Sequence, residues 1–190
     1  MSADIQFRVA TIDDLKSVYE LNDRFNLKNI VDHETKFGFV TNTYSMDELT
    51  SVINNQDMVV MVHNNLVKGC LYVINTISQS DILRTRWNRL IDEGKVDANA
   101  RVGFGARIII DKSFRHYRYP ADLFLKFFEL NADRYDCLFS GINRLNTVSL
   151  KALIKAYKAD IVDETAEYMY ILFHRSHNIP LYFDNDLALE

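Results

Sequence analysis

The residues best suited to chemistry are four cationic side chains in one short segment. Lys112, Arg115, His116 and Arg118 follow a run of β-branched residues and precede an apolar segment that begins near Pro120. Proline is favoured in the first turn of a helix, so the pattern predicts a strand, a basic loop and a helix N-terminus. The free N–H groups and the dipole of a helix N-terminus attract anions. In a chain of net charge −4, this cluster indicates a phosphate-bearing ligand; a solvated loop without a ligand is the alternative.

Other familiar chemistries lack their motifs. The sequence has no His-x-x-x-His or Cys-x-x-Cys pair, so we expect no metal. Gly103-Phe-Gly105 falls inside a predicted strand, whereas a dinucleotide loop follows a strand and opens a helix. No Gly-x-Ser-x-Gly elbow is present, which argues against a serine hydrolase.

The composition is that of an ordinary globular domain. The 190 residues are 48 % hydrophobic and 25 % charged, which suits one domain over residues 1–190 with a C-terminal tail over 175–190. Mild acidity argues against nucleic-acid binding, and no apolar run reaches the roughly 20 residues of a membrane helix. The start of the chain lacks the features of a secretory signal, and Cys70 and Cys137 lie in apolar stretches as free thiols do. We therefore expect a cytoplasmic protein with no nucleic-acid or membrane partner.

Hydrophobic periodicity predicts the elements that position the basic loop. Alternating or continuous apolar runs predict strands over Gln6–Ala10, Asp57–His63, Leu66–Ile74, Val102–Ile110, Cys137–Ser140, Ile161–Val162 and Tyr168–His174. Helical spacing predicts helices over Thr11–Asn26, Ser45–Ile53, Ser80–Glu93, Tyr119–Asp133 and Thr147–Lys158. Ser45 with Glu48 forms a capping box, and Asn64-Asn65 suits a tight hairpin turn. This order predicts the α/β (α+β) class, with a mixed sheet and helices on both faces.

From Phe7 to Phe173 that order resembles the GCN5-related N-acetyltransferase (GNAT) family. In that family a loop of pattern Gln/Arg-x-x-Gly-x-Gly/Ala after the fourth strand holds the pyrophosphate of acetyl-coenzyme A. The matching run here is Arg115-His-Tyr-Arg-Tyr-Pro120. The run Asn143-Arg-Leu-Asn-Thr-Val-Ser149 is similar to the Asn-x-x-Ser/Ala segment that contacts the coenzyme arm. Two further runs, Lys36-Phe-Gly-Phe-Val and Tyr44-Ser-Met-Asp-Glu-Leu, resemble one bacterial branch of the family.

The resemblance implies a fold, a reaction and a set of binding residues. The fold would be a mostly antiparallel twisted sheet of about seven strands. The reaction would move an acetyl group from acetyl-coenzyme A (acetyl-CoA), as co-substrate, directly to the amine of a small molecule or peptide, and a homodimer is possible for this family. The acceptor would lie near the first two helices, the insertion Ser80–Glu93 and the last strands. The coenzyme would contact Ile108, Ile110, Arg115, His116, Tyr117, Arg118, Tyr119, Ala121, Asn146 and Ser149.

The loop departs from the family pattern at two positions. Arg118 stands where the first glycine belongs and gives up its backbone freedom. Pro120 stands at the second and removes one N–H donor, although it suits a helix start. Charge-assisted bonds from Lys112, Arg115 and Arg118 would partly replace the lost donors, or their bulk would fill the phosphate site. A non-catalytic GNAT-like module that binds a ligand or a protein is therefore the alternative function, and a long-chain acyl synthase of the same fold is a further one.

The catalytic residues are weakly indicated. Many family members have a tyrosine as the acid for the leaving thiolate, and Leu153 occupies the equivalent position. Tyr157 lies one helical turn on and would either take that role or belong to the core. Water can serve instead, because a thiolate is a tolerable leaving group. The candidate general bases are Asp111, His63, His116 and His174.

Overall fold

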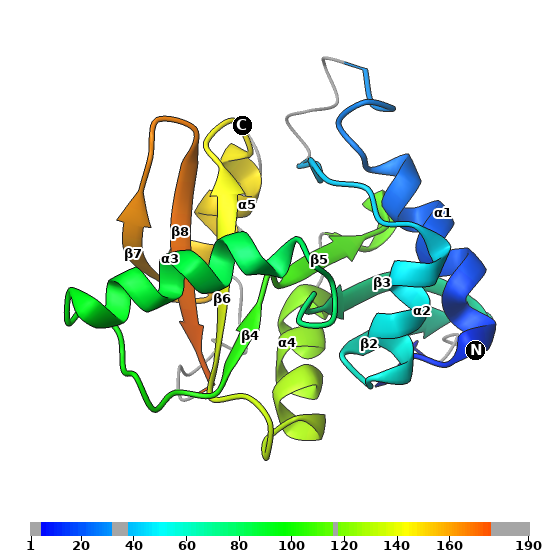
Figure 1. Ribbon diagram of the computed structural model, residues 1–190. Helices are drawn as coiled ribbons and strands as arrows, with labels where there is room; N and C mark the ends of the chain where they lie inside the picture. The colour runs from blue at the N-terminus through cyan, green and yellow to red at the C-terminus, as the bar shows by residue number, and fades with distance from the viewer. Residues whose placement is uncertain (1–4, 32–37, 116–117, 176–190) are drawn as a thin grey trace.

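The computed structural model describes residues 5–31, 38–115 and 118–175, and its strands form two four-stranded sheets (Figure 1). The first sheet has the order β1-β2-β3-β5 with every pair antiparallel. Its strands are β1 (Ile5–Val9), β2 (Met58–His63), β3 (Leu66–Tyr72) and β5 (Arg107–Ile110). The second has the order β4-β6-β8-β7, in which only β4 and β6 are parallel. Its strands are β4 (Val102–Phe104), β6 (Cys137–Asn143), β7 (Asp160–Glu164) and β8 (Tyr168–His174).

Helices cover both faces of the sheets, which confirms the predicted fold class (Figure 1). The longer helices are α1 (Leu15–Arg24), α2 (Met46–Asn54), α3 (Ser80–Asp92) and α4 (Tyr119–Leu130). Shorter turns are η1 (Ile12–Asp14), η3 (Lys112–Phe114), α5 (Thr147–Lys151) and the π-helical η4 (Ala152–Ala156). The helix predicted over Thr147–Lys158 therefore changes its winding partway and ends before Lys158, which has a positive φ of 57°.

Local signals in the sequence explain several of these boundaries. The backbone N–H of Glu48 donates to the Ser45 hydroxyl, and the Glu48 carboxylate accepts from the Ser45 N–H, so the capping box at the start of α2 is confirmed. Asn64 and Asn65 turn the β2–β3 hairpin with φ angles of 51° and 60°, as a tight hairpin requires. The sequence therefore fixes these elements through backbone geometry as well as through hydrophobic pattern.

The strand predicted over Val102–Ile110 is wrong as a single element, because a β-bulge divides it into β4 and β5. Arg107 is aligned with Tyr72, whereas the N–H of Ile74 donates to the carbonyl of Phe104. The three steps from Arg107 to Phe104 are thus paired with only two steps, from Tyr72 to Ile74, and such an extra residue on one strand defines a bulge. The bulge carries the chain from the second sheet into the first.

Three apolar clusters hold the layers together. The first joins α4 to one face of the first sheet and to β6 and β8, through residues such as Leu71, Phe124, Phe127 and Phe173. The second packs α1 and α2 on the opposite face of the first sheet, and the third packs α3 on the outer face of the second sheet. Both cysteines are free and buried, as expected. Burial on both faces leaves the junction of the two sheets as the place where a pocket opens.

Candidate functional site

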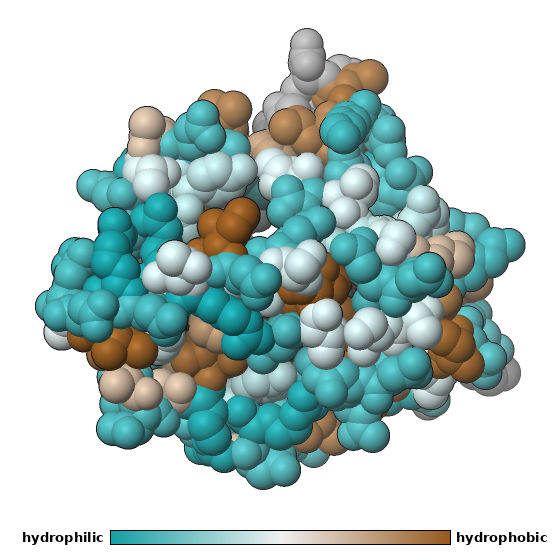
Figure 2. Space-filling model, in the orientation of Figure 1, coloured by the Kyte–Doolittle hydropathy of each residue, from teal (hydrophilic) through white to brown (hydrophobic). Residues whose placement is uncertain are grey.

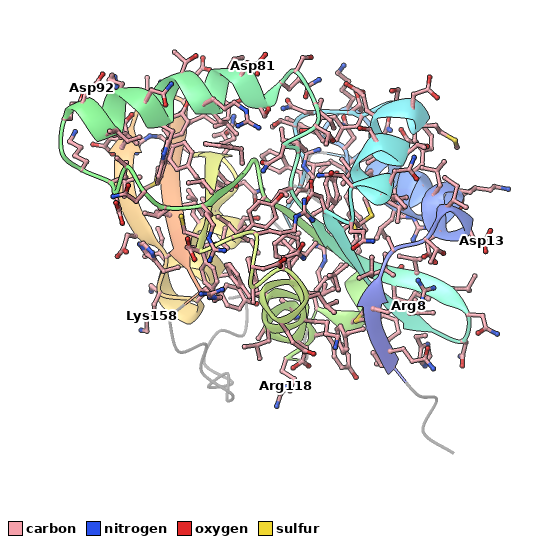
Figure 3. The ribbon with its side chains drawn as sticks, turned by 60° about the horizontal axis from the view of Figure 1, so that its bottom comes forward. Arg8, Asp13, Asp81, Asp92, Arg118 and Lys158 are labelled. Atoms are coloured by element: carbon pink, nitrogen blue, oxygen red, sulfur yellow. The ribbon has the colours of Figure 1, made fainter. Side chains whose placement is uncertain are left out.

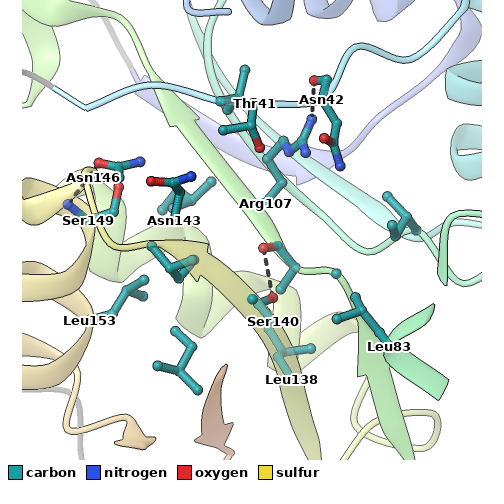
Figure 4. A pocket seen from close by; sticks show the side chains of 18 of the residues that line it. Thr41, Asn42, Leu83, Arg107, Leu138, Ser140, Asn143, Asn146, Ser149 and Leu153 are labelled. Carbon is teal, nitrogen blue, oxygen red and sulfur yellow. Dashed lines mark hydrogen bonds between the residues drawn. The ribbon is translucent and has the colours of Figure 1, made fainter. Parts of the chain in front are cut away.

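A pocket of about 360 Å³ lies where the two sheets diverge, and Figure 2 shows that face of the molecule hollowed near its centre. Its walls come from β5, β6 and β8, from α3, α4 and α5, and from residues 39–44, which we call the strap. Its floor is apolar, with Leu138, Leu153, Ile171 and Phe173. The polar groups on its walls include Thr41, Asn42, Arg107, Ser140, Asn143 and Asn146 (Figure 4).

The divergence of the sheets begins at one pair of hydrogen bonds. The N–H of Gly105 donates to the Phe139 carbonyl at 2.8 Å. The Ser140 hydroxyl donates to the Ala106 carbonyl at 3.0 Å (Figure 4). Beyond Ala106, β5 pairs with β3 alone, since the first sheet ends at β5. The second edge of β5 therefore borders the pocket instead of a neighbouring strand.

The main chain of β5 offers hydrogen-bonding groups at that edge. The N–H of Asp111 donates to the Lys68 carbonyl of the β3 side at 2.7 Å. Because bonded and non-bonded pairs alternate in an antiparallel ladder, Ile109 also bonds β3, whereas Ile108 and Ile110 direct their N–H and C=O groups away from it. Ile108 lines the pocket. The carbonyl of Ile110 accepts from the Arg115 Nε at 2.8 Å, so that group is already engaged.

The two arginines of the predicted phosphate loop have partners within the protein. Arg115 places its guanidinium 4.4 Å from the centre of the Phe25 ring, in addition to its bond to Ile110. Arg118 is exposed beside the start of α4, where it projects outward in Figure 3, and it forms a 2.7 Å ion pair with Asp122. Both cations therefore lie near the helix N-terminus, and neither lines the pocket.

In the first turn of α4, one residue lacks a backbone N–H and the N–H of the next is already hydrogen-bonded. Pro120 stands in that turn, as predicted, and the buried Ala121 donates its N–H to the Arg118 carbonyl at 2.8 Å. The Tyr119 ring packs toward Phe7, with centroids 6.2 Å apart. The predicted ligands His116 and Tyr117 lie outside the described residues, as does the tail 176–190.

Asn146 connects the pocket wall to the strap. Its side-chain NH₂ donates to the Phe39 carbonyl at 2.7 Å, and its side-chain oxygen accepts from the N–H of Ser149 at 3.3 Å. Through these two bonds Asn146 caps α5 and holds the strap in place. The residue is 6 % exposed, so both bonds are shielded from solvent. Of the residues expected at the coenzyme, Ile108, Asn146 and Ser149 surround the pocket.

The candidate catalytic residues lie outside the pocket lining. Asp111 caps η3, accepting from the Ser113 N–H at 3.1 Å and pairing with Arg24 at 3.0 Å. Burial raises the pKa of Asp111, but the Ser113 bonds and nearby cations outweigh it and hold that pKa below its usual value. Tyr157 is 2 % exposed in the core beside Phe124, and burial raises its pKa.

The two histidines in described positions, His63 and His174, are also absent from the pocket lining. His174 ends β8 opposite Cys137, at the far end of β6 from Asn143. His63 ends β2, where its ring lies 5.2 Å from that of Phe114. No Asp, Glu, His or Lys lines the pocket within the described residues. Proton transfer there depends on other groups or on water.

Sequence reasoning missed Arg107, which lines the pocket beside Ile108. Its Nη1 donates to the Asn42 carbonyl at 2.9 Å (Figure 4). Its guanidinium also lies 4.6 Å from the centre of the Tyr44 ring. A signal was available, because one arginine interrupts an otherwise apolar strand. Charged residues are rarely buried in strands unless something binds them.

The described residues also show what kinds of site they do not form. Residues 5–31, 38–115 and 118–175 contain no group of three His, Cys, Asp or Glu side chains placed to hold a metal ion. None of the helices in those ranges is both long and apolar enough to cross a bilayer.

Comparison of whole structures finds acetyltransferases whose architecture resembles that of this chain. A PaiA N-acetyltransferase from Thermoplasma acidophilum, in complex with coenzyme A, matches with a TM-score of 0.59 at 15 % identity, over 90 % of this chain and 99 % of that one. A GNAT acetyltransferase from Listeria monocytogenes matches with a TM-score of 0.61 at 11 % identity, over 92 % and 98 %. The chain has the GNAT fold. The expected resemblance is thereby confirmed at the level of architecture.

A third structure of similar architecture also matches, whereas the sequence comparisons find no match. The protein yncA from Salmonella typhimurium, with its cofactor acetyl-CoA, matches with a TM-score of 0.55 at 10 % identity, over 94 % of this chain and 98 % of that one. No family model and no curated protein sequence matches the chain. The chain thus shares the GNAT fold with these neighbours at 10–15 % sequence identity.

Proposed function

We propose that this GNAT-fold chain is an acyl-CoA-dependent N-acetyltransferase that moves an acetyl group directly from acetyl-CoA to an amine. The observation that carries the proposal is the edge of β5. There Ile108 directs its main-chain groups away from β3 and lines a pocket between diverging sheets. An extended coenzyme arm would pair with that edge as an added strand does. Two neighbours with this fold are complexes with coenzyme A or acetyl-CoA, which supports coenzyme binding by this chain.

The start of α4 supplies a place for the diphosphate of the coenzyme. Phe124 lines the pocket, and Tyr119 begins the same helix five residues earlier, which is about 8 Å along the axis. A helix N-terminus attracts phosphate through its dipole, and Arg115 and Arg118 add positive charge nearby. The bond of Arg118 to Asp122 holds the guanidinium at this end of the helix.

The transfer itself needs few side chains. The neutral amine attacks the thioester carbonyl, a C–N bond forms, the C–S bond breaks, and coenzyme A leaves as its thiolate. The N–H at the β5 edge would donate to the developing oxyanion. Because no described lining residue is a carboxylate or histidine, water takes the amine proton, and the leaving thiolate needs no strong acid.

The test combines ligand-dependent unfolding with release of coenzyme A. Acetyl-CoA at one hundred times its Kd should raise the free energy of unfolding by about 2.7 kcal/mol. Thiol release should then depend on an added amine, with the acetylated amine identified by mass. Stabilisation without transfer to any amine would favour the non-catalytic module, and no stabilisation at millimolar acetyl-CoA would contradict the proposal.

A further inference from the structure

Arg107 is the one charged side chain among the described residues that line the pocket. It precedes Ile108 on β5, and strand alternation turns it toward the α1 and α2 side, as it turns Ile109. The Asn42 carbonyl accepts one of its N–H groups, and the Tyr44 ring lies against its guanidinium. The side chain is therefore held in place at the pocket wall by the strap.

Among the described residues, the guanidinium of Arg107 has no carboxylate partner. Other described arginines commonly have one, as in the pairs that Arg8 forms with Asp14 and Arg134 with the fully buried Asp57. Within the part of the chain that the structure describes, no carboxylate oxygen lies within 4.0 Å of the Arg107 nitrogens. A half-buried cation without a counter-ion is costly.

The unused donors of Arg107 suit one kind of ligand group. A guanidinium carries five N–H donors in a planar fork. The Asn42 carbonyl takes one of them and the Tyr72 hydroxyl accepts another, so the remaining donors are available to a ligand. The fork matches the two oxygens of a carboxylate, and the resulting bonds are charge-assisted. The pocket thus presents a preformed carboxylate site beside the strand edge assigned to the thioester.

We infer that the acceptor is a compact amine that also carries a carboxylate, bound by Arg107, as in a free α-amino acid. The inference rests on the proposed acetyl transfer at the same pocket. The pocket volume of about 360 Å³ would be shared with the coenzyme arm, so the part of the acceptor that enters it must be compact. Arg107 and Ile108 are consecutive residues. An acceptor whose carboxylate is bound by Arg107 would therefore have its amine near the thioester that is bound at the main chain of Ile108.

The same wall disfavours cationic acceptors. A polyamine or an aminoglycoside brings several ammonium groups, and no described lining residue is a carboxylate that would receive them. The charge of Arg107 also lowers the pKa of an amine bound close to it. The acceptor would then bind more readily in the neutral form that attacks the thioester.

The experiment compares acids with their amides. The full chain with acetyl-CoA is assayed for coenzyme release with the twenty free amino acids, the matching amino acid amides and spermidine. We expect at least one free amino acid to be used about tenfold better than its amide, as kcat/KM. Arg107→Gln should raise KM for that acid by about 10- to 100-fold, leave KM for the amide nearly unchanged, and preserve acetyl-CoA binding.

Arg84→Gln is the matched control. Arg84 also lies over an aromatic ring, that of Phe104, and donates to a backbone carbonyl, that of Asn75, but it does not line the pocket. It should keep the preference for the acid. Equal use of acids and amides, an unchanged ratio in Arg107→Gln, or neither turnover nor stabilisation with any free amino acid would overturn the inference. If acetyl-CoA still stabilises the protein in those cases, only the acceptor inference fails and the transferase proposal stands. If acetyl-CoA does not stabilise the protein, the transferase proposal itself fails.

Discussion

Arg118 is the residue at which the proposed diphosphate site can be tested with least damage to the fold. It is exposed, and its ion pair and hydrogen bonds with Asp122 join it to a residue one turn along the same helix. Arg115 is less suitable, because its bond to the Ile110 carbonyl also supports the end of β5. Reversing the charge at 118 therefore separates anion binding from stability better than reversing it at 115.

We predict that Arg118→Glu raises the Kd for acetyl-CoA more than about tenfold, because a carboxylate near the phosphates replaces an attraction by a repulsion. Calorimetric titration measures the change. Lys126→Glu is the matched control, since it makes the same charge reversal at a partly exposed position of the same helix, eight residues away, or about 12 Å. Equal affinities for the two variants would move the diphosphate away from this helix end.

Asp14 tests how much one buried carboxylate stabilises the start of α1. Its carboxylate accepts from Arg8 at 2.6 Å and from the N–H of Thr11 at 2.8 Å, and it is 7 % exposed. Burial raises the pKa of Asp14, but these bonds outweigh it and leave the pKa lowered. A lowered folded-state pKa stabilises the protein above the ordinary aspartate value of about 4 and loses that contribution as the pH falls.

We therefore predict that Asp14→Asn lowers the free energy of unfolding at neutral pH and that its difference from the parent protein shrinks as the pH is lowered through the ordinary aspartate range. Urea unfolding at a series of pH values measures both. Asp13→Asn, at the exposed neighbour visible in Figure 3, should change little at any pH. A difference for Asp14→Asn that does not vary with pH would assign its effect to shape instead of charge.

At the scale of elements, the bulge between β4 and β5 creates the pocket. Gly105 lies in it with a φ of +65°, and a Cβ there would come within 2.4 Å of Ile74. Gly94, after α3, has nearly the same φ of +66° but open space around the Cβ position. The pair thus separates the cost of backbone conformation from the cost of contact.

We predict that Gly94→Ala and Gly105→Ala each lose about 1–2 kcal/mol through the left-handed backbone, with an additional loss for Gly105→Ala through contact with Ile74. Because Gly105 and Ile74 both line the pocket, only Gly105→Ala should also weaken acetyl-CoA binding. Thermal unfolding and titration measure the two effects. Equal stability losses would mean that Ile74 moves aside freely.

The elements themselves were largely predictable, but the bulge and the strap were not. Capping at Ser45 and the Asn64-Asn65 turn are local signals, so hydrophobic pattern and turn chemistry located these elements. The bulge at Gly105 depends on which neighbours its chain pairs with, and those pairings join residues far apart in the sequence. Arg107 escaped notice for the same reason, since its partners Asn42 and Tyr44 come from a distant segment.

At the scale of the whole molecule, the two sheets are joined beside α4 by a buried polar network. Asp57, at the start of β2, is fully buried, accepts from the Tyr135 hydroxyl at 2.6 Å and pairs with Arg134 at 2.8 Å. Tyr135 lies two residues before β6 of the second sheet, and its hydroxyl also accepts from Asn75 at 3.2 Å. The network joins the sheets at one end, so that they separate only at the other, where Ile108 faces the pocket.

The measurement that tests the central claim most directly is a crystal structure of the full chain grown with acetyl-CoA. We expect the coenzyme arm to run along β5 with hydrogen bonds to the main chain of Ile108, and the diphosphate to lie at the N-terminus of α4. Arginine side chains filling that end of α4 would contradict the account, as would a pocket in which β5 and β6 stay unoccupied at saturating acetyl-CoA.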